Sequence, residues 1–346
     1  RGWAAWEPGR AAVLIALADT LSKILPVGLK GDVRKMHPTL RRLVADFEKI
    51  RRKYPDVGDA WQATYVASIF ASDPKKAWKT ALVPLPESLA GDVELQRKRL
   101  RTLRNLVLLW ERGDPVADLE AAMAAIPEAI RADEEVSETA AIVDYLRLVR
   151  GDAGAGATAI ATYTALAERR KGAAKAQALH NLGTLRSLSG DSEGAIAAWE
   201  EAIGLADEKG RDIIYLSAAI HTLSPEVLGS LDTLSKSRHS ALIRIQAIAW
   251  RAEAIRRGGG DAVPADEAYY AAVASEASGE LRANLPVGRL GIISTGEFTV
   301  NLNYTIREGL TTILAVNAVP WLVPAAPITR ETKRRKDPRP KAPPTR

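Results

Sequence analysis

The sequence contains no cysteine, and this absence excludes disulfide frameworks, thiol nucleophiles, zinc–cysteine sites and iron–sulfur clusters. Phe and Met are scarce as well, at 3 and 2 residues, although hydrophobic residues make up 47% of the 346 residues. No run of apolar residues reaches 18, so the sequence offers no membrane-spanning segment. Ala, Leu, Ile and Val supply the apolar content, which predicts closely packed helices in two domains or in one long repeat array.

The net charge is concentrated at one end of the chain. The chain has 48 Lys and Arg and 42 Asp and Glu. Residues 329–346 contain 8 of the basic and 2 of the acidic residues, so the rest of the chain has 40 basic and 40 acidic residues. This neutral body argues against nucleic-acid binding and leaves the tail as the segment suited to a peripheral anionic surface. We expect the proline-rich tail to be extended and to clasp a neighbouring subunit through its basic residues Lys333, Arg334, Arg335 and Lys336.

Most of the chain has a helical pattern that is interrupted at regular intervals. Segments of 12 to 20 residues alternate with short breaks between residues 10 and 280, which predicts helical hairpins. Three breaks contain Gly-Asp, at positions 113, 151 and 190, and are therefore spaced 38 and 39 residues apart. This spacing predicts a helical-repeat domain over residues 1–284. An unrelated helical bundle is the alternative.

The third of these units carries the clearest motif, which runs Leu179-x2-Leu182-Gly183, then Gly190-Asp191, then Ala195-x3-Trp199-x2-Ala202. This motif resembles the tetratricopeptide repeat (TPR). Small residues at Gly183 and Ala195 let two antiparallel helices cross closely, and Trp199 fills the space between them. The resemblance implies a mainly α fold, an α-solenoid of TPR-like helical hairpins.

The resemblance also implies a binding surface. In tetratricopeptide proteins the first helix of each repeat lines a concave groove that holds an extended peptide or a partner helix, and the matching positions here are Gln177, His180, Asn181, Thr184 and Ser187. The family often uses Asn at the place of Asn181 to hold a peptide backbone or a terminal carboxylate. Leu188 stands where a basic residue usually completes the carboxylate clamp, which argues against that ligand. A polar stripe that only faces solvent is the alternative.

After residue 285 the hydrophobic period changes from helical to extended. Apolar and polar residues alternate strictly over 298–306, which predicts a half-buried strand. An apolar, β-branched segment at 310–319 follows it, and another short apolar segment at 290–294 precedes it. We expect a small three-stranded β-meander within residues 285–328, with its apolar face covered by the last helices or by another chain.

Charged clusters in the body are assigned to exposed helix positions. The acidic run at 133–135 is placed at a helix start, where carboxylates interact favourably with the helix dipole. The basic residues on the Leu-rich segment after residue 96 are interpreted as a solvated face, and they are Arg97, Lys98, Arg99, Arg101 and Arg104.

Signals for catalysis or metal binding are sparse. The four histidines show no metal-ligand spacing, and the chain has neither an H-E-x-x-H motif, nor a phosphate-binding G-x-x-x-x-G-K-[ST] loop, nor a G-x-S-x-G elbow. We therefore nominate no catalytic, cofactor-binding or metal-binding residue and expect no cofactor.

These observations predict a non-enzymatic protein that acts by protein–protein interaction, as a scaffold or a structural subunit of a larger assembly. Its partner is then another protein or neighbouring subunits. The alternative is the regulatory or substrate-recruiting part of an enzyme whose catalytic domain lies upstream of Arg1. Because residue 1 is not Met, we expect that an upstream segment has been removed, and a lost targeting peptide leaves the compartment open between cytoplasm and export.

Overall fold

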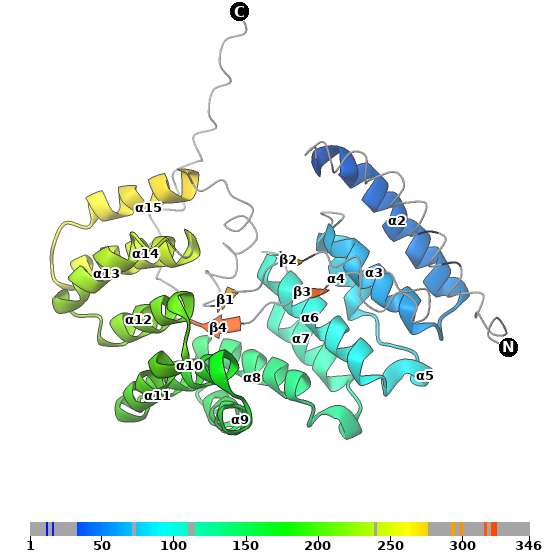
Figure 1. Cartoon of the computed structure of the whole chain (residues 1–346), viewed down its shortest axis with the longest axis horizontal. Coiled ribbons are helices and arrows are strands. Elements are labelled where there is room, and N and C mark those ends of the chain that lie inside the picture. The colour runs from blue at the N-terminus through cyan, green and yellow to red at the C-terminus, as the bar shows by residue number, and fades with distance from the viewer. Residues whose placement is uncertain are drawn as a thin grey trace, which may run out of the picture.

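The computed structural model describes residues 33–70, 74–109, 115–238 and 241–275, together with residues 12, 16, 292–294, 298–299, 315–316 and 320–323. This part of the chain is mainly helical (Figure 1). The helices are α2 (Val33–Lys53), α3 (Gly58–Phe70), α4 (Pro74–Leu82), α5 (Glu87–Ala90), α6 (Val93–Leu109), α7 (Pro115–Ala124), α8 (Glu134–Val149), α9 (Ala155–Arg169), α10 (Gly172–Leu188), α11 (Ser192–Leu205), α12 (Glu208–Thr222), α13 (Leu228–Leu234), α14 (Ala241–Arg257) and α15 (Val263–Ser275), with short 3-10 turns at Glu128–Ile130 and Pro225–Val227.

The Gly-Asp pairs at 151 and 190 make the same turn at the ends of α8 and α10. Gly151 has φ 102° and Gly190 has φ 87°, in the left-handed region that glycine enters without steric cost. In each turn the amide of the following Asp donates to a carbonyl five residues earlier, at 3.1 Å for Asp152 and 2.9 Å for Asp191, which closes the helix in a Schellman motif. The spacing of these two breaks therefore corresponds to a repeated local structure, while the Gly-Asp at 113 lies outside the described residues.

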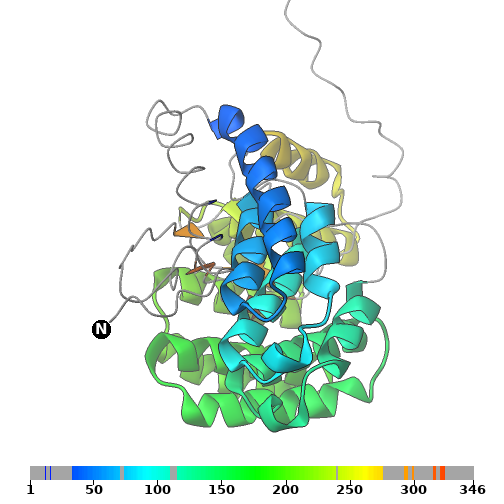
Figure 2. The same ribbon diagram turned by 90° about the vertical axis from the view of Figure 1, so that its right-hand side faces the viewer.

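Helices that are neighbours in the chain are also neighbours in space from α6 to α15. In addition, α6, α8, α10, α12 and α14 contact one another in series, with the intervening helices packed between them. Figure 1 shows the helices following one another round an arc with β4 on its inner side, and Figure 2 shows the same array from the side of α2 and α3. Most of the buried apolar side chains form one continuous cluster that reaches from Trp61 to Val323, and two smaller clusters lie beside it. None of the described helices is long and apolar enough to cross a membrane.

The pair formed by α10 and α11 packs through the residues that the motif predicts. A Cβ atom on Gly183 would lie 2.6 Å from Nε1 of Trp199, so only glycine fits under the indole ring. Ala195 and Ala202 are fully buried on the same helix as Trp199. The indole Nε1 donates to the carbonyl of His180 at 3.2 Å. The structure thus confirms this predicted helix pair.

The described strands are short and form two separate pairs. β1 (Ile292–Ser294) pairs antiparallel with β4 (Pro320–Leu322), and β2 (Phe298–Thr299) pairs antiparallel with β3 (Ala315–Val316). β1 lies in the predicted strand at 290–294, but its partner β4 lies where the sequence predicted none. Most residues of the predicted meander, the boundary at 284/285 and the whole tail with its anchor Lys333–Lys336 lie outside the described residues.

Candidate functional site

The five residues predicted to line a groove lie on α10, and four of them are buried. Gln177, His180, Asn181 and Thr184 are each at most 1% exposed, whereas Ser187 is half-buried. The alternative of a solvent-facing stripe is therefore wrong for these four. What covers the middle of this surface is the segment 320–323 of the same chain, which lies on the inner side of the arc (Figure 1).

Three side chains on α8 and α10 form hydrogen bonds with the main chain of this segment. The Leu322 amide donates to Oδ1 of Asn181 at 2.8 Å, and the Thr184 hydroxyl donates to the Leu322 carbonyl at 2.9 Å. One residue further on, the hydroxyl of Tyr145 on α8 donates to the Val323 carbonyl at 3.2 Å. Buried main-chain groups need such partners, so these contacts compensate the loss of water around an extended peptide.

The side chain of Trp321 is 5% exposed and packs against α10 and α12, and we call the space that it fills the Trp pocket. Its indole lies against the imidazole of His180, with ring centroids 5.1 Å apart and ring planes at 56°. On α12, the position that a Cβ atom would occupy on Gly210 lies 3.1 Å from Cη2 of Trp321. The absence of a side chain at Gly210 therefore leaves the room that the indole ring fills.

Hydrogen bonds fix the tautomer of His180. Oδ1 of Asn181 accepts the Leu322 amide, so it is the amide oxygen, and Nδ1 of His180, 3.1 Å from the same atom, must carry a hydrogen. Nε2 then accepts from the hydroxyl of Ser217 on α12 at 2.8 Å. Burial lowers the pKa of His180 to about 4, so the ring is neutral at pH 7. With both ring nitrogens engaged, His180 orients Asn181 toward the bound main chain.

Sequence reasoning missed Tyr145, Gly210 and Ser217 as members of this site. A signal for Tyr145 existed, because it stands 39 residues before Thr184, the same spacing as the two Gly-Asp turns. Both residues donate a hydroxyl hydrogen to a carbonyl of the held segment. No comparable signal marked Gly210, whose role depends on a residue more than 100 positions away.

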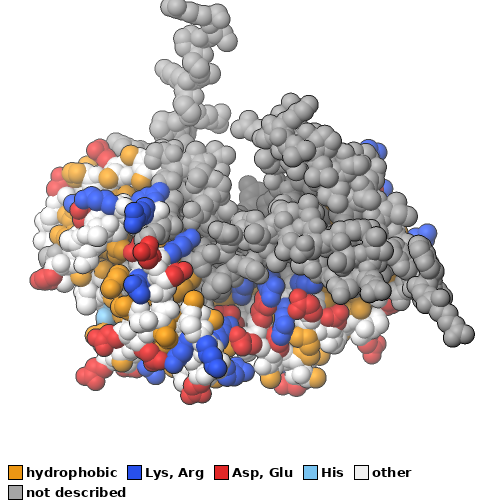
Figure 3. Space-filling model, in the orientation of Figure 1, with side chains coloured by type: hydrophobic (Ala, Val, Ile, Leu, Met, Phe, Trp, Pro, Cys, Tyr) orange, Lys and Arg blue, Asp and Glu red, His pale blue; other side chains and the backbone are white. Residues whose placement is uncertain are grey.

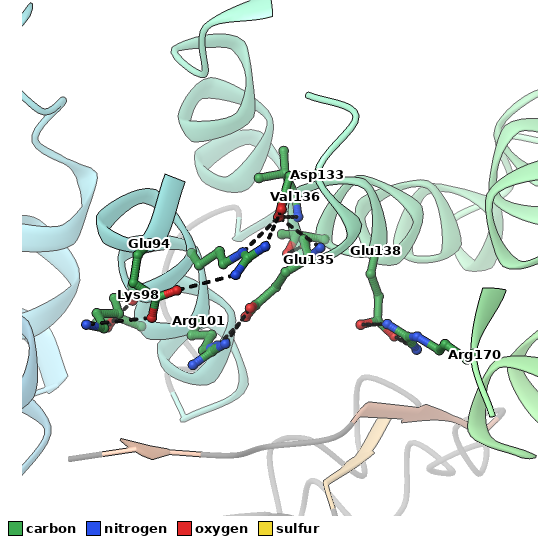
Figure 4. A network of polar contacts seen from close by, with 11 residues as sticks. Glu94, Lys98, Arg101, Asp133, Glu135, Val136, Glu138 and Arg170 are labelled. Carbon is green, nitrogen blue, oxygen red and sulfur yellow. Dashed lines mark hydrogen bonds and ion pairs between the residues drawn. The ribbon is translucent and has the colours of Figure 1, made fainter. Parts of the chain in front are cut away.

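A buried ionic cluster adjoins the site where α8, α9 and α10 meet (Figure 4). The Arg170 guanidinium donates to both carboxylate oxygens of Glu138, at 3.2 and 3.0 Å, and Gln177 bonds to both residues. The Arg170 and Glu138 side chains are only 12% and 8% exposed. These hydrogen bonds of Gln177 therefore connect α10 to the ion pair and not to segment 320–323.

The interpretation of the basic residues on α6 as a solvated face is wrong for most of them. Arg99 and Arg104 are 1% and 4% exposed, and Nε of Arg99 donates to the last-turn carbonyl of Ala81 in α4. Arg97 and Arg101 each form two hydrogen bonds with one carboxylate of the 133–135 run at the start of α8 (Figure 4). The helix-start position of that run is confirmed, since Asp133 caps α8. These charges thus join α6 to α4 and to the start of α8.

A separate cavity of about 280 Å³ lies between α3, α5 and α6. Its lining is mostly acidic among the charged residues, with Asp56, Asp59, Asp92 and Glu94, and Lys98 also lines it. In the parts of the chain that the structure describes, no three histidines or carboxylates converge closely enough to hold a metal ion.

On the face drawn in Figure 3, basic and acidic side chains are interspersed over the described residues, without a broad area of one sign. Comparison of the chain with protein-family models gives no match. Comparison with curated proteins and with solved structures gives no match either.

Proposed function

We propose that this chain is a non-enzymatic interaction protein, an α-solenoid of TPR-like hairpins whose inner face binds extended peptide segments. The observation that carries the proposal is the set of hydrogen bonds from Asn181, Thr184 and Tyr145 to the main chain of residues 322 and 323. Main-chain hydrogen bonds combined with a side-chain pocket are the usual chemistry of peptide recognition. In its assembly the chain acts as a scaffold or a structural subunit and binds a protein partner or neighbouring subunits.

Contacts between positions about one repeat apart support the solenoid. Glu138 on α8 bonds to Gln177 on α10, 39 residues later, and His180 on α10 bonds to Ser217 on α12, 37 residues later. Stacked repeats place equivalent positions of consecutive units side by side, so such spacings are typical of repeat arrays. The serial contacts among α6, α8, α10, α12 and α14 agree with this arrangement.

The C-terminal tail, residues 329–346, is the arm that provides the second contact of the proposed assembly. Its basic residues would anchor the arm on an acidic surface of a neighbouring subunit. We would measure the mass of the purified chain and of its cross-linked complexes by light scattering, and compare it with a variant in which Lys333, Arg334, Arg335 and Lys336 are all Ser. The matched control replaces four exposed lysines of the body by Ser, and these are Lys49, Lys79, Lys171 and Lys236.

We expect the wild-type chain and the control to form an assembly larger than the 37.3 kDa monomer, and the arm variant to lose it. A wild-type chain that stays monomeric and acquires no cross-linked partner would contradict the proposal. An arm variant that assembles as well as the control would remove the arm from the interface.

A further inference from the structure

We infer that the inner face contains a recognition site for an extended peptide with a Trp followed by an aliphatic residue, and that the chain's own Trp321 and Leu322 occupy this site as an internal ligand. This inference rests on the proposed function and specifies its ligand. The ligand from outside is a segment of a different protein with the same chemistry, which displaces the internal one.

The tryptophan preference follows from the two walls of the pocket. The imidazole of His180 provides a ring at 5.1 Å centroid distance, and it is held in place by Ser217 and Asn181. Gly210 on α12 provides a second wall, where any side chain would meet the far end of the indole ring. A smaller apolar side chain would leave part of this space empty, with loss of the contacts that the indole makes.

The preference for an aliphatic residue after the Trp follows from burial. Leu322 is fully buried and Val323 is 1% exposed, both within the continuous apolar cluster. A charged side chain in either place would be desolvated without a partner. Main-chain groups at 322 and 323 are bound whatever the side chain is, so the hydrogen bonds select an extended backbone and the pockets select the sequence.

Covalent attachment explains why the site is filled in the free chain. Residues 276–319 connect the internal ligand to the end of α15. A ligand attached in this way acts at an effective concentration in the millimolar range. An outside peptide with the same contacts must therefore compete against this occupant. Weakening the internal ligand should open the site to peptides in solution.

The test uses the full-length chain and a fluorescein-labelled synthetic peptide with the sequence of residues 317–325, Asn-Ala-Val-Pro-Trp-Leu-Val-Pro-Ala. Trp321→Ala removes the indole from the internal ligand and should weaken its hold about a hundredfold or more. We expect fluorescence anisotropy to show saturable peptide binding to Trp321→Ala and at least tenfold weaker binding to the wild-type chain. The same peptide with Trp replaced by Ala should bind Trp321→Ala at least tenfold more weakly than the original.

Two second substitutions in the Trp321→Ala chain test the pocket itself. Gly210→Val fills the pocket and should reduce binding of the peptide at least tenfold. Gly204→Val is the matched control, because Gly204 lies on an exposed face of α11 where an added Cβ atom would meet nothing within 4 Å, and it should leave binding unchanged. If Trp321→Ala does not unfold cooperatively, Trp321→Leu takes its place, since it keeps an apolar side chain at this position.

Equal peptide binding by the Gly210→Val and Gly204→Val chains would overturn the inference, as would the absence of binding by a folded Trp321→Ala chain. A wild-type dimer that the peptide dissociates would assign the ligand to a second copy and overturn its assignment to a different protein. The assembly measured with the arm variants does not depend on the Trp pocket, so failure of the inference and failure of the proposed function give different results.

Discussion

Gly183 is the residue whose replacement tests the packing of α10 on α11 most sharply. A methyl group added there would lie 2.6 Å from Nε1 and 2.7 Å from Cδ1 of Trp199. Favourable contacts need about 3.5 Å or more, so the indole would have to move by about 1 Å. The ring is 3% exposed, and it donates a hydrogen bond to the carbonyl of His180, the residue that also contacts Trp321.

The expected loss of stability follows from three contributions. Overpacking of a buried site costs about 1–3 kcal/mol, and weakening the bond to the His180 carbonyl costs about 0.5–1.5 kcal/mol. Replacing a helical Gly by Ala returns about 1 kcal/mol through helix propensity. Gly183→Ala should therefore lower the free energy of unfolding by about 0.5–3.5 kcal/mol.

Urea unfolding followed by circular dichroism measures this difference. Gly204→Ala in α11 is the matched control, because a Cβ atom there meets nothing within 4 Å, and it should leave stability unchanged or raise it by up to about 1 kcal/mol. If Gly183→Ala stabilised the chain as much as Gly204→Ala, the close contact between the two helices would be refuted.

Two further predictions concern buried charge. The unfolded chain binds a proton at His180 below about pH 6.5, whereas the folded chain binds it only below about pH 4. The contribution of His180 to the free energy of unfolding should therefore fall by about 3 kcal/mol as the pH drops from 6.5 to 4. A His180→Gln variant should lack this part of the pH dependence when unfolding is measured in urea. Arg170→Met removes the cation that pairs with the buried carboxylate of Glu138 and leaves that carboxylate its hydrogen bond from Gln177. The substitution should lower the free energy of unfolding in urea by about 3–5 kcal/mol. The double variant Arg170→Met/Glu138→Met removes both charges and should recover a large part of this loss. An Arg170→Met chain as stable as the wild type would show that the ion pair contributes nothing.

The local features of the fold could be predicted from the sequence. Gly183, Ala195 and Trp199 stand in a fixed small-and-large pattern within 17 residues, so their pairing required no knowledge of distant segments. The turn at Gly190 was predicted for the same reason. His180 and Asn181 lie four and three residues before Thr184, so the sequence also places these three side chains on the same side of the helix.

The occupant of the site could not be predicted from the sequence. Pro320 and Pro324 enclose only three residues, which is too short for a hydrophobic period to appear. The contact of Leu322 with Asn181 spans 141 residues, and nothing in either local sequence indicates it. The charges of α6 were misjudged for a related reason, since their partners at 133–135 belong to another helix.

Amide hydrogen exchange at Leu322 tests the central claim, that the inner face holds the main chain of segment 320–323. Selective ¹⁵N-leucine labelling resolves this amide by NMR, and a Leu322→Met variant assigns its signal. The buried bond to Asn181 predicts exchange that is slowed at least about a thousandfold relative to an exposed chain, comparable to the amides in the middle of α10. Exchange at the rate of an exposed chain, in a protein whose α10 amides remain protected, would contradict the claim.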